Sequence, residues 1–327
     1  MNILITGITG FIGGELCKTL LTERSNSITA LIRQDTALQR YIIFKENNVN
    51  CIEGDIADRD FIHSVFKKKF DVVYHIAALR GGRDFSKKEY YRSNVDAAVN
   101  IAEESLEHNV KMIFCSSVGV FGAIPKELPP TENTVRQQDN YYHYTKIEAE
   151  KKLKELVPQG LNLVIIRPSI TYGIDDYGFP FTLIKLIDKG MMLLPSKDIM
   201  INMADVSTLI QAFILAGTAK IKSGSAYNIA DRHPVSLKGL THFINHELKN
   251  SDYPKWKKLP NFLSKLGLII FSKLMKNELW TSRIELISKS WFYDVTPAMK
   301  DLKFKPHDTI PAFSYVIDWY KQIKEEN

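Results

Sequence analysis

The sequence predicts an α/β protein with a Rossmann-type, doubly wound parallel sheet and a smaller, mostly helical C-terminal lobe. Short apolar runs rich in β-branched residues alternate with longer helical stretches through the first half of the chain, as in βαβ units. A glycine-rich turn directly follows the first of these runs, and the alternation stops after residue 167. A chain of 327 residues is long enough for one large α/β unit and a smaller lobe.

The alternating runs predict six strands with helices between them. We expect strands at residues 3–6, 28–32, 49–53, 72–75, 112–116 and 163–167, and helices near residues 12–23, 58–67, 87–108 and 141–156. Strands and helices in this order favour a doubly wound sheet over a barrel or a sandwich.

After residue 167, glycines and prolines predict loops, followed by a helix at 205–216 and a strand at 226–229. From residue 236 the chain is predicted to be mostly helical, and it ends in a helix at 309–324. We therefore expect a first domain over residues 1–168, to which the chain returns around residues 200–230. Residues 169–199 and 231–327 are expected to form the second lobe.

The composition is that of an ordinary globular protein and gives no indication of a nucleic-acid or metal-binding protein. Hydrophobic residues make up 45% of the chain and charged residues 24%, and the net charge of +6 is spread along the sequence, which argues against nucleic acid as a partner. The three cysteines, Cys17, Cys51 and Cys115, lack metal-ligand spacing. We therefore expect free thiols, no metal and a reducing, cytoplasmic location.

No membrane-spanning segment is expected. The N-terminus enters a strand at once, which leaves no room for a signal peptide, and the most apolar run, residues 266–275, is about half of the length that a spanning helix needs. The composition of residues 260–279 is compatible with a basic interfacial helix. Packing of that segment against the other lobe is the favoured interpretation, and peripheral membrane contact is the alternative.

The glycine-rich turn, residues 7–13, predicts a site for a dinucleotide cofactor. Gly7, Gly10 and Gly13 allow a tight turn and a close approach of the backbone to a pyrophosphate. The free N–H groups of the helix that begins around Phe11 and Ile12 would hold the phosphate oxygens.

Two positions bear on the choice of cofactor. Arg33 ends the second strand, where an acidic residue would accept hydrogen bonds from the ribose hydroxyls of NAD. A guanidinium suits the additional 2′-phosphate of NADP, so we expect NADP to be preferred, with NAD as the alternative. The alternative interpretation of Arg33 is a surface side chain that points to water. Asp55, at the end of the third strand, is placed to accept a hydrogen bond from the adenine amino group.

Tyr142 and Lys146 form the candidate catalytic centre. They are four residues apart at the start of a predicted helix, so they share one face of it. An ammonium group near a phenol lowers its pKa and makes tyrosine a usable proton shuttle. Ser116 and Ser117 close the fifth strand at the carboxyl edge of the sheet, and Ser117 could hold a substrate oxygen beside Tyr142.

Together these residues resemble the extended short-chain dehydrogenase/reductase family, within the NAD-dependent epimerase/dehydratase superfamily. The resemblance covers nearly the whole chain and rests on the glycine turn, Gly54-Asp55, the stretches 75–78 and 116–122, Asn94-Val95, the Tyr142/Lys146 pair and Arg167-Pro168.

The resemblance implies that Tyr142 is the acid/base, that Lys146 lowers its pKa and binds the nicotinamide ribose, and that Ser117 orients the reacting group. Asn94 would support the lysine and the cofactor. The cofactor would also contact a further set of residues: Ile56, Ala77, Ala78, Ser116 and Pro168. A homodimer would be typical of the family.

Within the family, Ser169 stands where nucleotide-sugar epimerases usually carry asparagine, and Phe121 replaces a common tyrosine. With the stretches 291–295 and 302–306, these residues look more like the 3β-hydroxysteroid dehydrogenase and dihydroflavonol reductase branches. An apolar wall at Phe121, and the aromatic and thioether side chains of the second lobe, would then suit a hydrophobic substrate. The alternative is that these side chains of the second lobe belong to a core. These side chains are Tyr177, Phe179, Phe181, Met191 and Met192.

The resulting expectation is an NAD(P)-dependent oxidoreductase that interconverts a secondary alcohol and a ketone on a sterol-like or other lipid-like small molecule. Arg80 and Arg83 keep open a nucleotide-sugar epimerase or dehydratase with tightly bound NAD, since they could receive an anionic substrate. A regulatory protein that binds NAD(P) without turnover is a third alternative. Such proteins commonly lack the tyrosine or the lysine, and both are present here.

Overall fold

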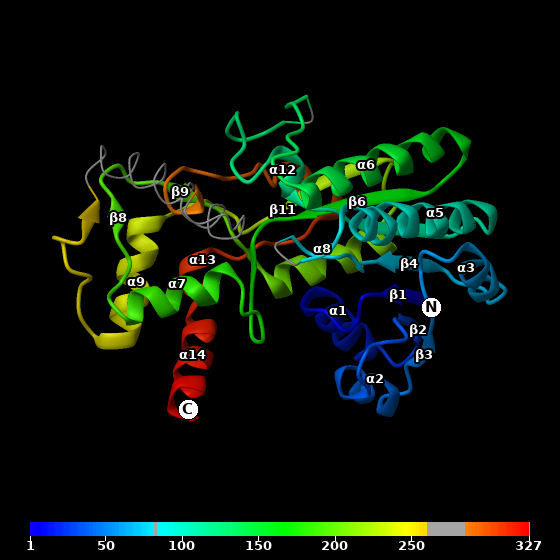
Figure 1. Cartoon of the computed structure of the whole chain (residues 1–327), viewed down its shortest axis with the longest axis horizontal. Helices are drawn as coiled ribbons and strands as arrows, with labels where there is room; N and C mark the ends of the chain where they lie inside the picture. Colours follow the sequence, from blue (N-terminus) through cyan, green and yellow to red (C-terminus); the bar gives the residue numbers. More distant parts are fainter. Residues whose placement is uncertain (82–83, 132, 260–284, 327) are drawn as a thin grey trace.

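The predicted fold class is confirmed. The computed structural model describes residues 1–81, 84–131, 133–259 and 285–326 (Figure 1). Seven parallel strands form one sheet in the order β11-β6-β5-β4-β1-β2-β3. The six strands expected in the first half are all present within one residue of the predicted bounds, and the strand expected at 226–229 is the edge strand β11.

The strands of the described residues are β1 (Asn2–Thr6), β2 (Ser27–Ile32), β3 (Asn50–Glu53), β4 (Val72–His75), β5 (Lys111–Cys115), β6 (Leu163–Pro168), β7 (Thr171–Tyr172), β8 (Leu194–Pro195), β9 (Met200–Ile201), β10 (Ala204–Asp205), β11 (Ser225–Ile229), β12 (Val235–Ser236) and β13 (Lys258–Leu259). The longer helices are α1 (Phe11–Leu21), α3 (Arg59–Phe66), α5 (Ala97–Glu107), α6 (Tyr141–Leu156), α7 (Phe179–Asp188), α8 (Val206–Thr218), α9 (Leu237–Lys249), α12 (Thr296–Leu302) and α14 (Ser314–Glu326). The shorter helical segments are Leu38–Arg40, α2 (Ile42–Glu46), α4 (Lys87–Tyr91), the π-helical turn Arg92–Asp96, Val118–Phe121, Val157–Gln159 and α13 (Thr309–Ala312).

The central strands are apolar throughout because both faces of the sheet are covered. In β1, Ile3 and Ile5 face a core that includes side chains of α1 and α8, whereas Leu4 faces the opposite core, under α3, α5 and α6. All three side chains are fully buried. Burial on both faces is the pattern of a parallel sheet with helices on each side.

A second core, separate from the packing on the two faces of the sheet, is built mostly by the C-terminal part of the chain, at the left of Figure 1, and also contains Val118, Val120 and Phe121. It is built by apolar faces of α7, α9 and α14, and the buried side chain of Trp291 packs into it. This core contains residues from both 169–199 and 231–327. The exact division of the chain into two domains stays a prediction.

Several elements differ from the sequence-based expectation. The stretch expected as one helix at 87–108 contains a π-helical turn at Arg92–Asp96, and the helix expected at 309–324 is divided into α13 and α14. Helix α7 occupies part of a region expected as loops. No helix among the described residues is long and apolar enough to span a membrane. The segments 266–275 and 260–279 lie outside the described residues.

Candidate active site and cofactor pocket

A cavity of about 490 Å³ lies at the carboxyl ends of the central strands. The strand order reverses between β1 and β4, and this switch point is where open α/β sheets bind ligands. The Thr6 hydroxyl bonds to His75 Nδ1 at 2.8 Å and accepts from the Ala77 N–H at 3.1 Å. These bonds hold the ends of β1 and β4 together, so the loops that follow them face the same cavity.

The glycine turn fits the pyrophosphate of a dinucleotide. Gly7 has a φ of +84°, and a side chain there would lie 2.7 Å from the Ala77 backbone nitrogen. A Cβ at Gly13 would lie 2.2 Å from the Gly7 carbonyl oxygen. Gly10 caps α1, whose first turn contains no acidic residue to compete for the free N–H groups. The backbone therefore forms a cradle that side chains would fill, with its donors directed at an anion.

At the adenosine end of the pocket, Arg33 and Asp55 are paired with other side chains of the protein, which the sequence did not predict. Arg33 lines the cavity, but its side chain is 59% exposed and its Nε donates to Asp35 at 2.5 Å. Arg40, which the sequence analysis did not identify, also lines the pocket and donates to the Thr9 carbonyl at 2.8 Å. Asp55 lines the cavity as expected, and one of its carboxylate oxygens pairs with Arg92.

Tyr142 lies at the first turn of α6, where the Asn140 side chain caps the helix by accepting from the His143 N–H at 2.8 Å. Burial raises the pKa of Tyr142, and a hydrogen bond with Ser117 and the charge of Arg80 only partly oppose this effect. Ser117 in turn accepts from the Gly119 N–H at 3.0 Å. The structure thus brings the three groups Tyr142, Ser117 and Arg80 together at the cavity wall.

Lys146 is almost fully buried one turn further along α6. Its Nζ donates to the Cys115 carbonyl at 2.7 Å and lies over the Phe114 ring. Burial lowers the pKa of Lys146, while Cys115 and Glu150 oppose this change. The groups with the largest effects on the pKa of Tyr142 are Cys115, Arg80, Ser117 and Tyr90, and Lys146 is not one of them. Its expected role in lowering that pKa stays a prediction.

Asn94 lies behind the pocket wall instead of on it. Its amide accepts from the Leu79 N–H at 2.7 Å and donates to the Leu79 carbonyl and to the Thr145 hydroxyl. It therefore connects the loop after β4 to the helix that carries Tyr142 and Lys146. The adjacent Ser93 lines the cavity in its place.

A buried ion pair supports the same wall from behind. Glu150 accepts from Arg167 through both carboxylate oxygens, at 2.8 and 2.6 Å, and from the Ser116 hydroxyl at 2.6 Å. Burial alone would raise the pKa of Glu150, but Arg167 and the hydrogen bonds hold it below its ordinary value. Tyr142, Lys146 and Glu150 follow at intervals of four along α6, so one helix face carries all three.

The substrate side of the cavity is more polar than expected. Arg80 lies 4.0 Å from the buried carboxylate of Asp176, and both line the cavity with Ser169 and Phe179. Arg83 falls outside the described residues.

The proposed apolar wall at Phe121 is wrong. Its ring does not line the cavity and is fully buried in the second core, where the guanidinium carbons of Arg136 and Arg167 lie 4.5 and 5.4 Å from its centre.

The aromatic and thioether side chains of the second lobe also lie largely elsewhere. Tyr177 and Phe181 pack against Trp319 of α14 with ring centroids 5.3 and 5.4 Å apart. Met191 is exposed and Met192 is buried in the second core. Only Phe179 of that group lines the cavity.

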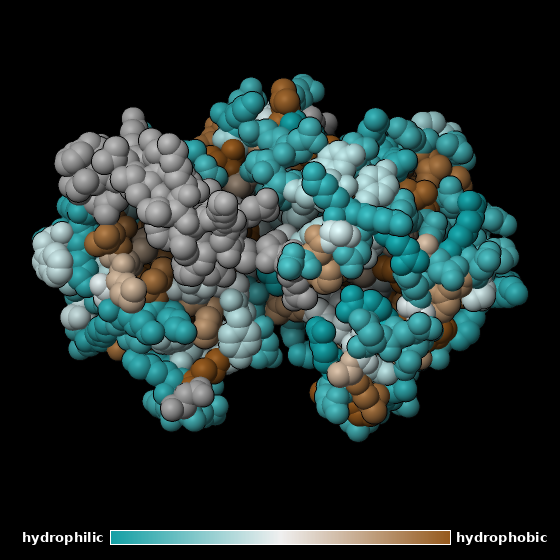
Figure 2. Space-filling model, in the orientation of Figure 1, coloured by the Kyte–Doolittle hydropathy of each residue, from teal (hydrophilic) through white to brown (hydrophobic). Residues whose placement is uncertain are grey.

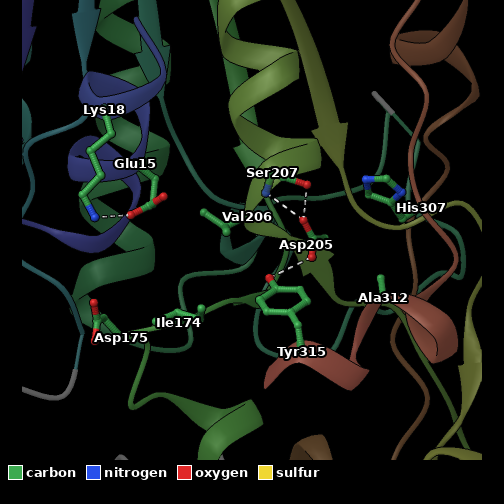
Figure 3. Close-up of a pocket in the computed structure, with 10 residues that line it drawn as sticks. All are labelled: Glu15, Lys18, Ile174, Asp175, Asp205, Val206, Ser207, His307, Ala312 and Tyr315. Atoms are coloured by element: carbon green, nitrogen blue, oxygen red, sulfur yellow. Dashed lines mark hydrogen bonds and ion pairs between the residues drawn. The ribbon is translucent and has the colours of Figure 1, made fainter. Parts of the chain in front are cut away.

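A second cavity, of about 580 Å³, lies between α1, the loop after β7 and α8 (Figure 3). Its buried carboxylate, Asp205, accepts from Ser207 and from the Tyr315 hydroxyl at 2.9 Å. Lys18 pairs with Glu15. These groups already have partners within the chain, so their chemistry is that of helix capping and packing.

All but one of the predicted site residues line the first cavity. They are Gly7, Gly10, Phe11, Ile12, Gly13, Arg33, Asp55, Ile56, Ala77, Ala78, Ser116, Ser117, Tyr142, Lys146 and Pro168. Asn94 is the exception. Sequence reasoning missed Arg40, which ends the short helical turn Leu38–Arg40, and Asp176, which lies in the loop between β7 and α7. It also missed Glu150, whose i+4 spacing from Lys146 was the available signal. In the described part of the chain, no group of side chains is arranged to hold a metal.

Comparison with known proteins agrees with this geometry. Residues 3–230 match the model of the NAD dependent epimerase/dehydratase family. The chain is 27% identical over 321 residues to the UDP-glucose 4-epimerase of Vibrio cholerae, covering 94% of this chain and 92% of that protein. It is 28% identical over 281 residues to the N-acetyl-α-D-glucosaminyl-diphospho-ditrans,octacis-undecaprenol 4-epimerase of Escherichia coli O157:H7, covering 84% and 80%.

Among solved structures, the UDP-glucuronic acid 4-epimerase of Bacillus cereus in complex with NAD superposes with a TM-score of 0.75. The alignment covers 99% of both chains at 20% identity, which establishes the shared fold. Because the family model spans more than half of the sequence, the chain belongs to the NAD dependent epimerase/dehydratase family, as an enzyme of the extended short-chain dehydrogenase/reductase type.

Proposed function

We propose that this enzyme is a 4-epimerase of a sugar linked to a diphosphate. The observation that carries the proposal is the similarity to a UDP-glucose 4-epimerase, which extends over nearly the full length of this chain and of that relative. The polar substrate side of the cavity, with Arg80 and Asp176, supports a sugar over a sterol. The E. coli relative acts on a sugar attached to a polyprenyl diphosphate, so the carrier is either a nucleoside or a lipid.

In this proposal Tyr142 moves the proton and Ser117 holds the reacting oxygen. Tyr142 takes the proton of the C4 hydroxyl as the alcohol becomes a ketone. When the ketone is reduced again on its other face, Tyr142 returns the proton to the oxygen. NAD held by the glycine turn, Asp55 and Lys146 would supply the hydride acceptor and donor, and its oxidised ring would add positive charge beside Tyr142. Arg80 receives the negative charge of the diphosphate. Burial raises the pKa of Tyr142, so positive charge beside the phenol is essential to this role.

The test is to incubate the purified enzyme and NAD with UDP-glucose, UDP-N-acetylglucosamine and a polyprenyl-diphosphate-linked N-acetylglucosamine, and to follow the C4 configuration of the product by NMR. We expect inversion at C4 without net change in nicotinamide absorbance. Stoichiometric NAD(P)H turnover with ketones or sterols, and no C4 inversion, would instead support the hydrophobic-substrate oxidoreductase. Ser169, a cavity residue in place of the epimerase asparagine, favours that second candidate.

Replacing Lys146 with methionine should weaken both turnover and cofactor binding. Methionine keeps much of the buried volume but removes the ammonium group proposed to bind the nicotinamide ribose. We expect a loss of roughly tenfold or more in NAD affinity, since a charged hydrogen bond contributes about 1.5–3 kcal/mol. Titration calorimetry measures the affinity. An unchanged dissociation constant for NAD would show that Lys146 does not bind the nicotinamide ribose.

We further propose that the pocket binds NADP more tightly than NAD, through Arg33. Because Arg33 is largely exposed and already pairs with Asp35, the expected preference is about tenfold, at the low end for a charge-assisted contact. Arg33→Ala should remove most of that ratio and leave NAD affinity nearly constant. Titrating both cofactors into both proteins tests this. Equal wild-type affinities would contradict it, and a preference that survives the substitution would shift the role to Arg40.

A further inference from the structure

We propose that one corner of the molecule, at the end of α7, docks on an anionic membrane surface. The corner, called here the β8 corner, consists of Met191, Leu193 and Trp256 with four lysines, Lys189, Lys255, Lys257 and Lys258. It lies near β8 and α9, at the end of the molecule away from the N-terminus (Figure 1). The proposal does not depend on the identity of the substrate.

Large apolar side chains of the β8 corner face solvent. Met191 is 64% exposed, Leu193 46% and Trp256 78%. Met192 and Leu194, which alternate with the first two, are buried in the second core. The segment is therefore apolar on both sides, although only one side has a core to pack against. Figure 2 shows hydrophobic surface set among hydrophilic surface at this end of the molecule.

Backbone contacts bring these side chains together from distant parts of the sequence. The Leu194 N–H donates to the Lys257 carbonyl at 3.0 Å, and β8 pairs with β13. The Lys257 ammonium donates to the Gly190 carbonyl and lies 5.2 Å from the centre of the Trp256 ring. Trp256 and the 191–193 segment are thus held beside each other, which makes one continuous surface.

The charged side chains of the β8 corner are all lysines, and the exposed carboxylate of Asp252, which precedes them in the sequence, lies 4.0 Å from His242. Lys189, Lys255 and Lys258 are exposed, and none of the four lysines has an ion pair with a described carboxylate. The nearby Asp188 pairs instead with Lys249 and Lys324. In the sequence, the corner leads directly to residues 260–279, whose composition is also apolar and basic. That segment lies outside the described residues and is not part of the proposed surface.

An anionic bilayer fits this combination better than other partners. A second copy of the chain, paired through the same surface, would place lysines against lysines. A nucleic acid would satisfy the lysines but give Met191 and Leu193 no apolar partner. At a bilayer interface, tryptophan and aliphatic side chains enter the boundary of the acyl chains while lysines meet the lipid phosphates.

Vesicle flotation of the full-length protein tests the proposal. We expect binding to vesicles made of equal parts phosphatidylcholine and phosphatidylglycerol, and binding at least about tenfold weaker to pure phosphatidylcholine or when salt is raised from about 0.1 M to about 0.5 M. The double variant Lys255→Gln/Lys258→Gln should weaken binding by roughly twentyfold to thirtyfold, at about fivefold for each lysine. Trp256→Ala and Met191→Ser should each weaken it as well, without changing the melting temperature.

Matched substitutions elsewhere serve as controls. Lys67→Gln/Lys68→Gln removes two exposed lysines after α3, and Val135→Ser removes an apolar side chain that is 70% exposed. These variants should bind like the wild type. The proposal is overturned if the protein does not float, if neutral vesicles bind equally well, or if the controls lose as much binding as the corner variants. Light scattering that shows a dimer lost on Met191→Ser would assign the corner to a second copy instead.

Discussion

Tyr142→Phe is expected to lower turnover by a factor on the order of 100 or more, while the affinity for NAD changes little. The substitution removes only the hydroxyl that is proposed to move the proton and keeps the ring that forms part of the cavity wall. Steady-state kinetics with the sugar substrate and titration with NAD measure the two quantities separately.

The control is Tyr144→Phe, two residues along the same helix. Tyr144 does not line the described cavity, and its ring packs on Tyr141 with centroids 5.1 Å apart. Loss of a hydroxyl there should leave turnover near the wild-type value. If Tyr142→Phe keeps nearly full turnover, the proton must move through another group, and the assignment of Tyr142 as acid/base fails.

Much of the candidate site was predictable because backbone geometry demands particular residues. A Cβ at Gly13 would collide with the Gly7 carbonyl. The spacing of the glycines in the sequence therefore predicts that the turn after β1 packs closely against α1. The position of Tyr142 and Lys146 was predictable for a similar reason, since residues four apart share a helix face regardless of the rest of the fold.

Contacts between distant segments were not predictable in the same way. Phe121 was expected in the pocket wall, but it is buried beside Arg136 and Arg167, which come from two later parts of the chain. Arg33 was identified from its place at the end of β2, whereas its pairing with Asp35 depends on a local turn. Asn94 was expected to support the lysine side of the site, but its bonds to Leu79 and Thr145 depend on the packing of two separate segments.

The buried Glu150–Arg167 pair should have the largest effect on stability of any ion pair among the described residues. Arg167→Met leaves the Glu150 carboxylate buried without its main partner, which is expected to cost about 3–5 kcal/mol of unfolding free energy. Glu150→Leu should be costly for the converse reason, because it leaves the buried Arg167 guanidinium without its partner. Replacing both charges, by Glu150→Leu with Arg167→Met, should cost clearly less than the sum of the single changes, because no unpaired charge remains.

Denaturant unfolding of the four proteins measures the coupling, and the surface pair Arg59–Glu103 provides the comparison. That pair is separated by 3.0 Å, but the Arg59 side chain is 71% exposed and that of Glu103 36%, so Arg59→Met should cost less than about 1 kcal/mol. Equal losses at the two sites would mean that the buried pair contributes no more than a solvated one.

The pH dependence gives an independent test of the same pair. Arg167 holds the pKa of Glu150 below its ordinary value, so the stabilisation is fully present above the unfolded-state pKa, near 4.3 for a free glutamate. It should decline as the pH falls through the folded-state pKa. The wild type should therefore lose stability more steeply than Glu150→Gln below about pH 4, since the variant has no carboxylate to protonate there. If the stability of the two proteins falls in parallel as the pH is lowered, protonation of Glu150 is not the cause of the acid destabilisation.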